Sequence, residues 1–322
     1  MPQFKVLLTD YAWEDVEIER RILSAADADL VVAERTDTES LVTLAGEHAV
    51  DAIMTNWADV PAEVISASKR CRIVSRLGIG LDNIDVAFCT AQRIPVTNVP
   101  DYCVTEVAEH ALASLLAMAR KIAFYHHQTQ QGRYELQAGG PMRRLEGQTL
   151  GIVGLGNIGR CLASKAQGLG LHVIATSRSG KNVPDGVEIV ELDSLLERSD
   201  FVSLHVPLVD ETRHLIGKAE FDRMKSSAFL INTARGGVID HDALAAALDE
   251  EKIAGAALDV QEVEPPDLSQ APYNHARVIV TPHAAFVSIE SLENLRTRTA
   301  TQVADWLQGE TPENVVNPEV LD

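Results

Sequence analysis

Short apolar runs alternate along this chain with longer segments in which apolar residues recur at helical spacing. This alternation is typical of α/β domains, because the crossover between two parallel strands is usually a helix. In the first hundred residues the pattern predicts strands at Phe4–Thr9, Leu30–Ala33, Ala52–Thr55, Ile73–Leu77 and Val96–Asn98. Amphipathic stretches predict helices over Asp15–Ala25 and Pro61–Lys69.

A second series of strands begins near Gly147. It consists of six apolar runs, at Thr149–Val153, Val173–Thr176, Phe201–His205, Phe229–Thr233, Ala256–Asp259 and Val278–Thr281. A helix over Val104–Arg120 precedes the series and is apolar on most faces, which indicates a buried core helix, a dimer contact or both. One more amphipathic helix is predicted over Ser288–Gln308. The fold class is therefore α/β, with two doubly wound parallel-sheet domains.

The composition narrows the class of protein. A chain of 322 residues exceeds the size of most single cores, so two domains are expected. The net charge of −19 argues against nucleic acid and anionic membranes as partners. The four cysteines form no CxxC pair, so we expect buried thiols in a reducing compartment and no metal site. No apolar run approaches the roughly 18 residues of a membrane helix, so a soluble cytoplasmic protein is expected.

A glycine-rich turn follows the first strand of the second series and opens a helix. Its sequence is Gly154-Leu-Gly156-Asn157-Ile158-Gly159. In this strand–turn–helix setting the glycines permit a tight turn, close approach to a pyrophosphate and close helix–strand packing. The N–H groups at the start of the helix favour phosphate binding. The turn therefore predicts a dinucleotide site.

The end of the next strand discriminates between the two nicotinamide cofactors. In NAD sites an acidic residue about 20 positions after the glycines binds the ribose 2′-OH. Here the chain has Ser177, Arg178 and Ser179, with Lys181 close behind, and no carboxylate. These hydroxyl and cationic groups suit a 2′-phosphate, so NADP(H) is favoured over NAD(H). The alternative is a solvated basic turn without function.

Three polar residues follow the fourth, fifth and sixth strands of this series: Arg235, Glu264 and His283. Because the carboxyl ends of the strands in a doubly wound sheet face one crevice, these side chains are expected to converge. Reducing a keto acid requires a proton for the carbonyl oxygen and a cation for the carboxylate. A histidinium supported by a carboxylate provides the proton, and arginine provides the cation. Taken singly, each residue also suits an ordinary loop.

Several ordered motifs make the chain resemble the D-isomer-specific 2-hydroxyacid dehydrogenase family over nearly its whole length. They are Arg76-Leu-Gly-Ile-Gly-Leu-Asp82-Asn-Ile-Asp85, the Gly154–Gly159 turn, His205-Val206-Pro207, Asn232-Thr-Ala-Arg235-Gly-Gly237, Asp259 to Glu264-Pro265, and Thr281-Pro-His283. The resemblance implies that Arg235, Glu264 and His283 are catalytic and that Thr233 and Asp259 lie near the nicotinamide. It also implies that Gly78 and Ile79 offer N–H groups to the substrate carboxylate.

The segments Pro100–Val104 and His283–Phe286, together with Arg76, resemble the C-terminal-binding-protein branch of that family. This resemblance implies substrate contacts for Arg76 and Phe286. Gln261 departs from the family pattern by replacing a common aromatic residue. The substrate side chain is expected to be shaped by loop residues, with Asn56, Trp57, Tyr102 and Phe286 as candidates. Trp57 suits interdomain packing equally well.

The family implies a flavodoxin-like substrate domain, formed by residues 1–99 with 287–322, and a Rossmann dinucleotide-binding domain, formed by residues 100–286. The residues expected at the cofactor are Gly154, Gly156, Asn157, Ile158, Gly159, Ser177, Arg178, Ser179, Lys181, His205, Val206, Pro207, Thr233, Ala234, Arg235, Asp259 and His283.

We therefore expect an NADPH-preferring oxidoreductase, a homodimer, that reduces a small 2-keto acid to a D-2-hydroxy acid. Glyoxylate, hydroxypyruvate or a bulkier analogue would be its substrate. Two alternatives are a nucleotide-sensing interaction protein with little turnover, and a dehydrogenase of a non-carbon anion such as phosphite. The presence of all three residues, Arg235, Glu264 and His283, argues against the sensor, because a sensor does not need a His–Glu pair.

Overall fold

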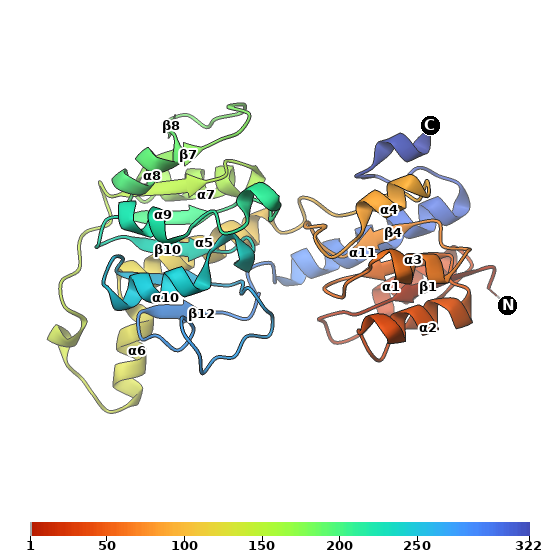
Figure 1. Ribbon diagram of the computed structural model, residues 1–322, viewed down its shortest axis with the longest axis horizontal. Helices are drawn as coiled ribbons and strands as arrows, with labels where there is room; N and C mark the ends of the chain where they lie inside the picture. Colours follow the sequence, from red (N-terminus) through yellow and green to blue (C-terminus); the bar gives the residue numbers. More distant parts are fainter. Residues whose placement is uncertain (1) are drawn as a thin grey trace. The chain divides into compact units, whose positions relative to one another are not determined.

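Two separate parallel sheets organise the chain (Figure 1). The computed structural model describes residues 2–322, and Met1, the first residue of the predicted substrate domain, lies outside them. The chain divides into two compact units. Unit 1 contains the residues up to Tyr102 together with Ser288–Asp322, and unit 2 contains Cys103–Val287. The predicted boundaries, after residues 99 and 286, lie three residues and one residue from these divisions.

The sheet of unit 1 has the strand order β2-β1-β3-β4-β5, and all its strands are parallel. Its strands are β1 (Phe4–Leu8), β2 (Ala28–Val32), β3 (Ala52–Thr55), β4 (Val74–Arg76) and β5 (Val96–Thr97). This order is that of flavodoxin-like folds, which confirms the predicted class. The chain reverses direction of winding between β1 and β3, where such sheets open a crevice for ligands.

Both faces of this sheet are covered by helices. One face packs on α1 (Glu17–Ala25) and α11 (Ile289–Gln308), and the other on α2 (Thr38–His48), α3 (Ala62–Ala67) and α4 (Val86–Ala91). Side chains of a strand alternate between the two faces. Accordingly Val6 and Leu8 join the core under α1 and α11, whereas Leu7 joins the opposite one. A strand buried on both faces reads as a continuous apolar run, as Val6–Leu8 of β1 does.

The sheet of unit 2 has the order β12-β11-β10-β9-β6-β7-β8, the doubly wound order of a Rossmann domain with one added strand. Its strands are β6 (Thr149–Val153), β7 (His172–Thr176), β8 (Val187–Ile189), β9 (Phe201–Leu204), β10 (Phe229–Asn232), β11 (Gly255–Leu258) and β12 (Val278–Val280). The prediction of six strands was wrong by one. The missed strand, β8, is a three-residue edge strand in which Glu188 and Ile189 are exposed, so it lacks an apolar run.

Helices also cover both faces of this second sheet. One face packs on α5 (Val104–Ala119) and α7 (Asn157–Gln167), and the other on α8 (Leu192–Arg198), α9 (Lys218–Arg223) and α10 (His241–Asp249). Six residues of α5 are buried, including Ala108, Ala111 and Leu115, so this helix is the core helix that the sequence predicts.

The remaining elements are short. They are α6 (Ile122–Gln130) and the 3-10 helices η1 (Leu136–Gly139), η2 (Asp210–Thr212), η3 (Gly236–Val238) and η4 (Pro318–Leu321). Among the helices of residues 2–322, none combines the length and the apolar character that crossing a membrane requires.

Candidate active site

The three glycines of the turn after β6 have different surroundings. The backbone of Gly154 has a φ of 100°, and a Cβ there would lie 2.8 Å from the carbonyl oxygen of His205. A Cβ at Gly159 would lie 2.4 Å from the carbonyl oxygen of Gly154. A Cβ at Gly156, in contrast, would meet no heavy atom within 4 Å. The outer glycines are thus required by packing, whereas the middle one leaves space open above the turn.

The open side of this turn suits a dinucleotide. Gly156 and Asn157 are exposed at the first residues of α7, where backbone N–H groups and the helix dipole attract phosphate. After β10, which β9 separates from β6 in the same sheet, the hydroxyl of Thr233 is buried and has no hydrogen-bond partner within residues 2–322. A buried hydroxyl without a partner carries a desolvation cost that a bound polar group would remove. The residues present therefore fit a nicotinamide dinucleotide.

The end of β7 is tied to the same turn. The hydroxyl of Thr176 accepts a hydrogen bond from the Gly154 N–H at 3.1 Å, a contact that sequence reasoning missed. Beyond it the chain folds into a tight loop, in which Ser177 Oγ accepts from Gly180 N at 3.1 Å and Ser179 Oγ from Lys181 N at 3.3 Å. Arg178 and Lys181 are exposed at the loop surface. The cationic side chains therefore remain accessible to a ligand.

His205 follows β9 and supports the turn through its backbone. Its N–H donates to Val153 O at 2.8 Å, and its carbonyl together with Val206 packs against Gly154. The ring lies 2.8 Å from the hydroxyl of Ser203. Burial lowers the pKa of His205 from 6.5 to about 4, so this imidazole is neutral at physiological pH. Its role in the fold is therefore packing rather than charge.

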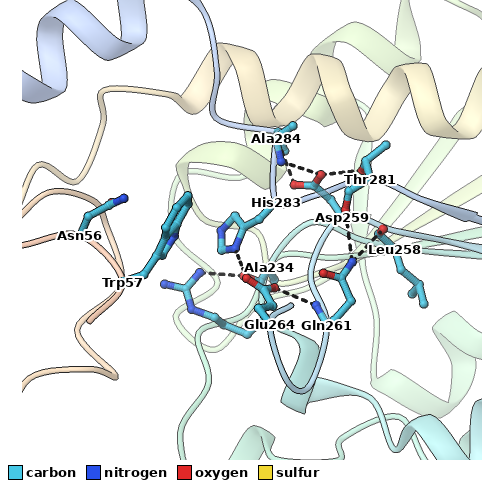
Figure 2. Close-up of polar contacts among 12 residues, drawn as sticks. Asn56, Trp57, Ala234, Leu258, Asp259, Gln261, Glu264, Thr281, His283 and Ala284 are labelled. Carbon is cyan, nitrogen blue, oxygen red and sulfur yellow. Dashed lines mark hydrogen bonds and ion pairs between the residues drawn. The ribbon is translucent and has the colours of Figure 1, made fainter. Parts of the chain in front are cut away.

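The imidazole of His283 and the carboxylate of Glu264 face each other. Nδ1 of His283 lies 2.7 Å from Oε2 of Glu264, and their side chains are 23% and 32% exposed (Figure 2). The second carboxylate oxygen, Oε1, accepts a hydrogen bond from the Gln261 N–H at 2.8 Å. The carboxylate is thus fixed by the backbone on one side and holds the imidazole on the other.

The backbone of His283 is in the left-handed region, with a φ of 53°. Such a conformation costs a non-glycine residue about 1–3 kcal/mol and persists only where the surroundings impose it. Here the buried Asp259 imposes it, because its carboxylate accepts hydrogen bonds from Ala284 N and Ala285 N, each at 2.9 Å (Figure 2). The Thr281 hydroxyl donates to the same carboxylate at 2.5 Å, and the Asp259 carbonyl accepts the His283 N–H at 2.8 Å.

Gln261 has a structural explanation that its sequence position did not suggest. Its side-chain amide donates to Thr281 O at 3.2 Å and Leu258 O at 3.4 Å, so it links the ends of β12 and β11 (Figure 2). Its backbone also packs on the loop after β10, since a Cβ at Gly236 would lie 2.0 Å from the Gln261 carbonyl carbon. This close packing places the Arg235 loop directly against the Glu264 loop.

Arg235 is held at the end of β10 by a residue of its own motif, whose positioning role the sequence did not indicate. The fully buried Asn232 accepts a hydrogen bond from Ala234 N at 3.0 Å and donates to Arg235 O at 2.8 Å. The Arg235 guanidinium donates to Ala234 O at 2.8 Å. Phe286 contacts His283 edge to face, with 6.1 Å between the ring centroids. Arg235, Glu264, His283 and Phe286 thus lie at the carboxyl edge of one sheet.

The other predicted substrate residues belong to unit 1, at the end of β4. The guanidinium of Arg76, which is 7% exposed, donates to Asn56 Oδ1 at 3.3 Å and also to the Leu77 carbonyl. It folds over Gly78, where a Cβ would lie 2.7 Å from Nη1. The carbonyl of Gly78 accepts from Val99 N at 3.0 Å. The segment is therefore held rigidly within its own unit.

Comparisons with known proteins agree with this geometry. Residues 112–285 match the D-isomer specific 2-hydroxyacid dehydrogenase, NAD binding domain family. The chain is 41% identical to a glyoxylate reductase of Korarchaeum cryptofilum over 279 residues, which cover 84% of each protein. It is 38% identical to a hydroxypyruvate reductase of Thermotoga maritima, over 81% of this chain and 85% of that one.

A solved structure extends the similarity to the whole fold. The chain is similar to an acyclic imino acid reductase in complex with NADPH and D-Arg, with a TM-score of 0.86 and 26% identity. The match covers 97% of this chain and 99% of that one. The two doubly wound units, the glycine turn and the matching relatives lead to one assignment: the chain belongs to the D-isomer specific 2-hydroxyacid dehydrogenase family.

Proposed function

We propose that this enzyme reduces glyoxylate or hydroxypyruvate to the corresponding 2-hydroxy acid, with the D configuration where the product is chiral, and prefers NADPH as the reductant. The observation that supports the reaction most directly is the 2.7 Å contact between His283 and Glu264 at the carboxyl edge of the dinucleotide-binding sheet. A histidine in this setting can hold a proton next to a carbonyl oxygen. The names of the relatives, a glyoxylate reductase and a hydroxypyruvate reductase, support the substrate class.

Each residue of the trio has a distinct proposed role. When bound, the reduced nicotinamide supplies a hydride for C2 of the keto acid. Because Glu264 engages Nδ1 of His283, the proton for the carbonyl oxygen passes through Nε2. The Glu264 carboxylate orients the ring through this contact at Nδ1. Arg235 binds the substrate carboxylate through its planar guanidinium and polarises the carbonyl.

The residues of unit 1 are proposed substrate ligands as well. Arg76 is charged and firmly positioned by Asn56, and Gly78 and Ile79 belong to a segment whose carbonyls are already bonded. A carboxylate suits such a segment, because carboxylates bind guanidinium groups and backbone N–H groups.

The preference for NADPH rests on the loop after β7. Arg178 and Lys181 are exposed there, and residues 176–181 contain no carboxylate that would accept a hydrogen bond from a ribose 2′-OH. A 2′-phosphate, which is doubly charged, favours guanidinium and ammonium partners. A similar solved structure, the imino acid reductase, was determined with NADPH.

The test is NADPH oxidation by the purified enzyme with glyoxylate, hydroxypyruvate and phenylpyruvate, followed by chiral analysis of the product. We expect reduction of the two small acids and a D product from hydroxypyruvate, whereas the product from glyoxylate is achiral. Absence of turnover with every acid of a broad keto-acid panel, in folded protein that binds NADPH, would overturn the proposal.

A further inference from the structure

A single carboxylate in unit 1 binds three consecutive backbone N–H groups. Asp10 lies just after β1, at the carboxyl edge of the sheet. Its Oδ1 accepts hydrogen bonds from Asn56 N at 3.0 Å and Ala58 N at 3.2 Å, and its Oδ2 accepts from Trp57 N at 2.7 Å. The hydroxyl of Thr9 adds a fourth bond to Oδ1, at 2.7 Å. The four donors match the acceptor capacity of an ionised carboxylate.

The same loop is fixed on its carbonyl side. The carbonyl of Ala58 accepts hydrogen bonds from Thr55 Oγ1 and from Asn83 Nδ2, each at 2.8 Å. Asp10 therefore binds the N–H groups of residues 56–58, while Thr55 and Asn83 bind the carbonyl of Ala58. Loop backbones usually retain freedom because water satisfies them. The backbone of this loop retains little conformational freedom, and Trp57 lies within the restrained part.

Trp57 is presented by this restrained loop rather than buried in a core. The loop follows β3, and Trp57 is 44% exposed. The neighbouring Asn56 is 2% exposed and accepts a hydrogen bond from Arg76, which we propose as a substrate ligand. In a parallel α/β sheet, residues after the strand carboxyl ends are those that meet ligands. A rigidly held indole beside a substrate ligand is suited to select the group attached to the keto acid.

We propose that Asp10 is a positioning residue that determines which 2-keto acid side chains are accepted, by fixing the backbone of Trp57. The inference depends on the proposed function, because it concerns the substrate of that site. Asp10 does not touch the reacting atoms. Its effect is exerted on discrimination between side chains, while the chemistry at the carbonyl is independent of it.

The geometry explains why an acid is needed at this position. An asparagine of the same shape can keep one oxygen for Asn56, Ala58 and Thr9, but its amino group then faces the N–H of Trp57. Two donors would point at each other. Asp10→Asn therefore releases Trp57 selectively, and Asp10→Ala releases the whole loop.

The experiment measures kcat/KM for glyoxylate, hydroxypyruvate and phenylpyruvate in the wild type, Asp10→Asn, Asp10→Ala, Trp57→Ala and the Asp10→Ala/Trp57→Ala double variant. Asp37→Ala is the matched control, since Asp37 also accepts a backbone N–H, that of Ser40 at 3.1 Å, but at the start of α2. The unfolding temperature and NADPH affinity of each variant are measured in parallel.

We expect Trp57→Ala to change the hydroxypyruvate-to-phenylpyruvate ratio of kcat/KM by roughly tenfold, the scale of a pocket contact. Asp10→Asn and Asp10→Ala should change it in the same direction, mainly through KM, and the double variant should change it no further than Trp57→Ala alone. Glyoxylate, which has no side chain, should be affected least, and Asp37→Ala should leave the ratio unchanged.

An unchanged ratio in both Asp10 variants, or additive effects in the double variant, would overturn the inference while the enzyme still reduces keto acids. Failure of the wild type with all three acids would instead overturn the proposed function. If Asp10→Ala does not fold, the isosteric Asp10→Asn decides the question.

Discussion

Nδ1 of His283 lies 2.7 Å from Oε2 of Glu264. The backbone of His283 has a left-handed conformation, which hydrogen bonds to Asp259 maintain. Hydrogen bonds position both members of the pair, because Gln261 N fixes the carboxylate and Asp259 fixes the turn that carries the ring. Precise placement is what acid–base catalysis requires of a proton donor. The proposed reaction depends on this relationship.

The first prediction concerns the choice of cofactor. Arg178→Ala should lower kcat/KM for NADPH by roughly tenfold, because it removes a charge-assisted contact to the 2′-phosphate. The value for NADH should not change. Arg223→Ala is a suitable control, since Arg223 is another exposed arginine, on α9, that pairs with Asp193 at 3.2 Å. Equal losses with both cofactors would contradict the NADPH preference.

The second prediction compares two glycines with opposite surroundings. Gly156→Ala should leave the unfolding temperature unchanged, since its Cβ meets nothing within 4 Å, yet weaken NADPH binding because it fills the space open to the pyrophosphate. Gly236→Ala should instead destabilise the protein by about 1–3 kcal/mol, because its Cβ would overlap the backbone of Gln261. Thermal unfolding and NADPH titration separate the two. Destabilisation by Gly156→Ala would argue against the open turn.

The third prediction concerns pH. Burial lowers the pKa of His205 from 6.5 to about 4, so the unfolded chain binds this proton at a higher pH than the native state does. The neutral ring therefore contributes stability above pH 6.5, and that contribution is lost as the pH falls from 6.5 towards 4. The loss is on the order of 2–3 kcal/mol.

Urea unfolding of the wild type and His205→Gln at pH 7.5, 6 and 5 checks this prediction. The difference in unfolding free energy between the two proteins should shrink as the pH falls. A difference that stays constant over this range would show that His205 is not kept neutral by burial.

The fourth prediction concerns the helix that returns to unit 1 near the end of the chain. Arg296 on α11 forms a two-pronged ion pair with the fully buried Glu19 on α1, with distances of 2.8 and 2.9 Å. Arg296→Met should destabilise the protein by about 3–5 kcal/mol, because it strands a buried carboxylate. The Glu19→Gln/Arg296→Met double variant should recover part of this loss. A double variant less stable than Arg296→Met alone would contradict the explanation.

Much of the fold could be predicted because strands buried on both faces are continuous apolar runs. Strands such as β3 and β6 have their predicted bounds, Ala52–Thr55 and Thr149–Val153. The missed strand β8 has the sequence Val-Glu-Ile at an edge, where solvent exposure removes the signal. Edge strands of this kind are defined by backbone pairing, which leaves little trace in composition.

The sequence placed polar residues after the strands, and the structure brings Arg235, Glu264 and His283 to one edge of one sheet. The residues that position them were not predictable. Asn232 and Gln261 act through hydrogen bonds to backbone atoms, which depend on loop conformation and have no side-chain pattern. Asp10 contacts a loop 46 residues further along the chain for the same reason. Motifs therefore indicate the chemistry, whereas the supporting contacts depend on the three-dimensional fold of the loops.

The central claim is that His283 donates the proton in the reduction of a 2-keto acid. The most direct measurement is kcat for NADPH oxidation with glyoxylate in the wild type, His283→Asn and Glu264→Gln, with NADPH affinity measured for each. We predict turnover by the wild type, a loss of at least about a hundredfold in His283→Asn, a smaller loss in Glu264→Gln, and retained NADPH binding. A His283→Asn variant that binds NADPH and turns over at the wild-type rate would contradict the claim.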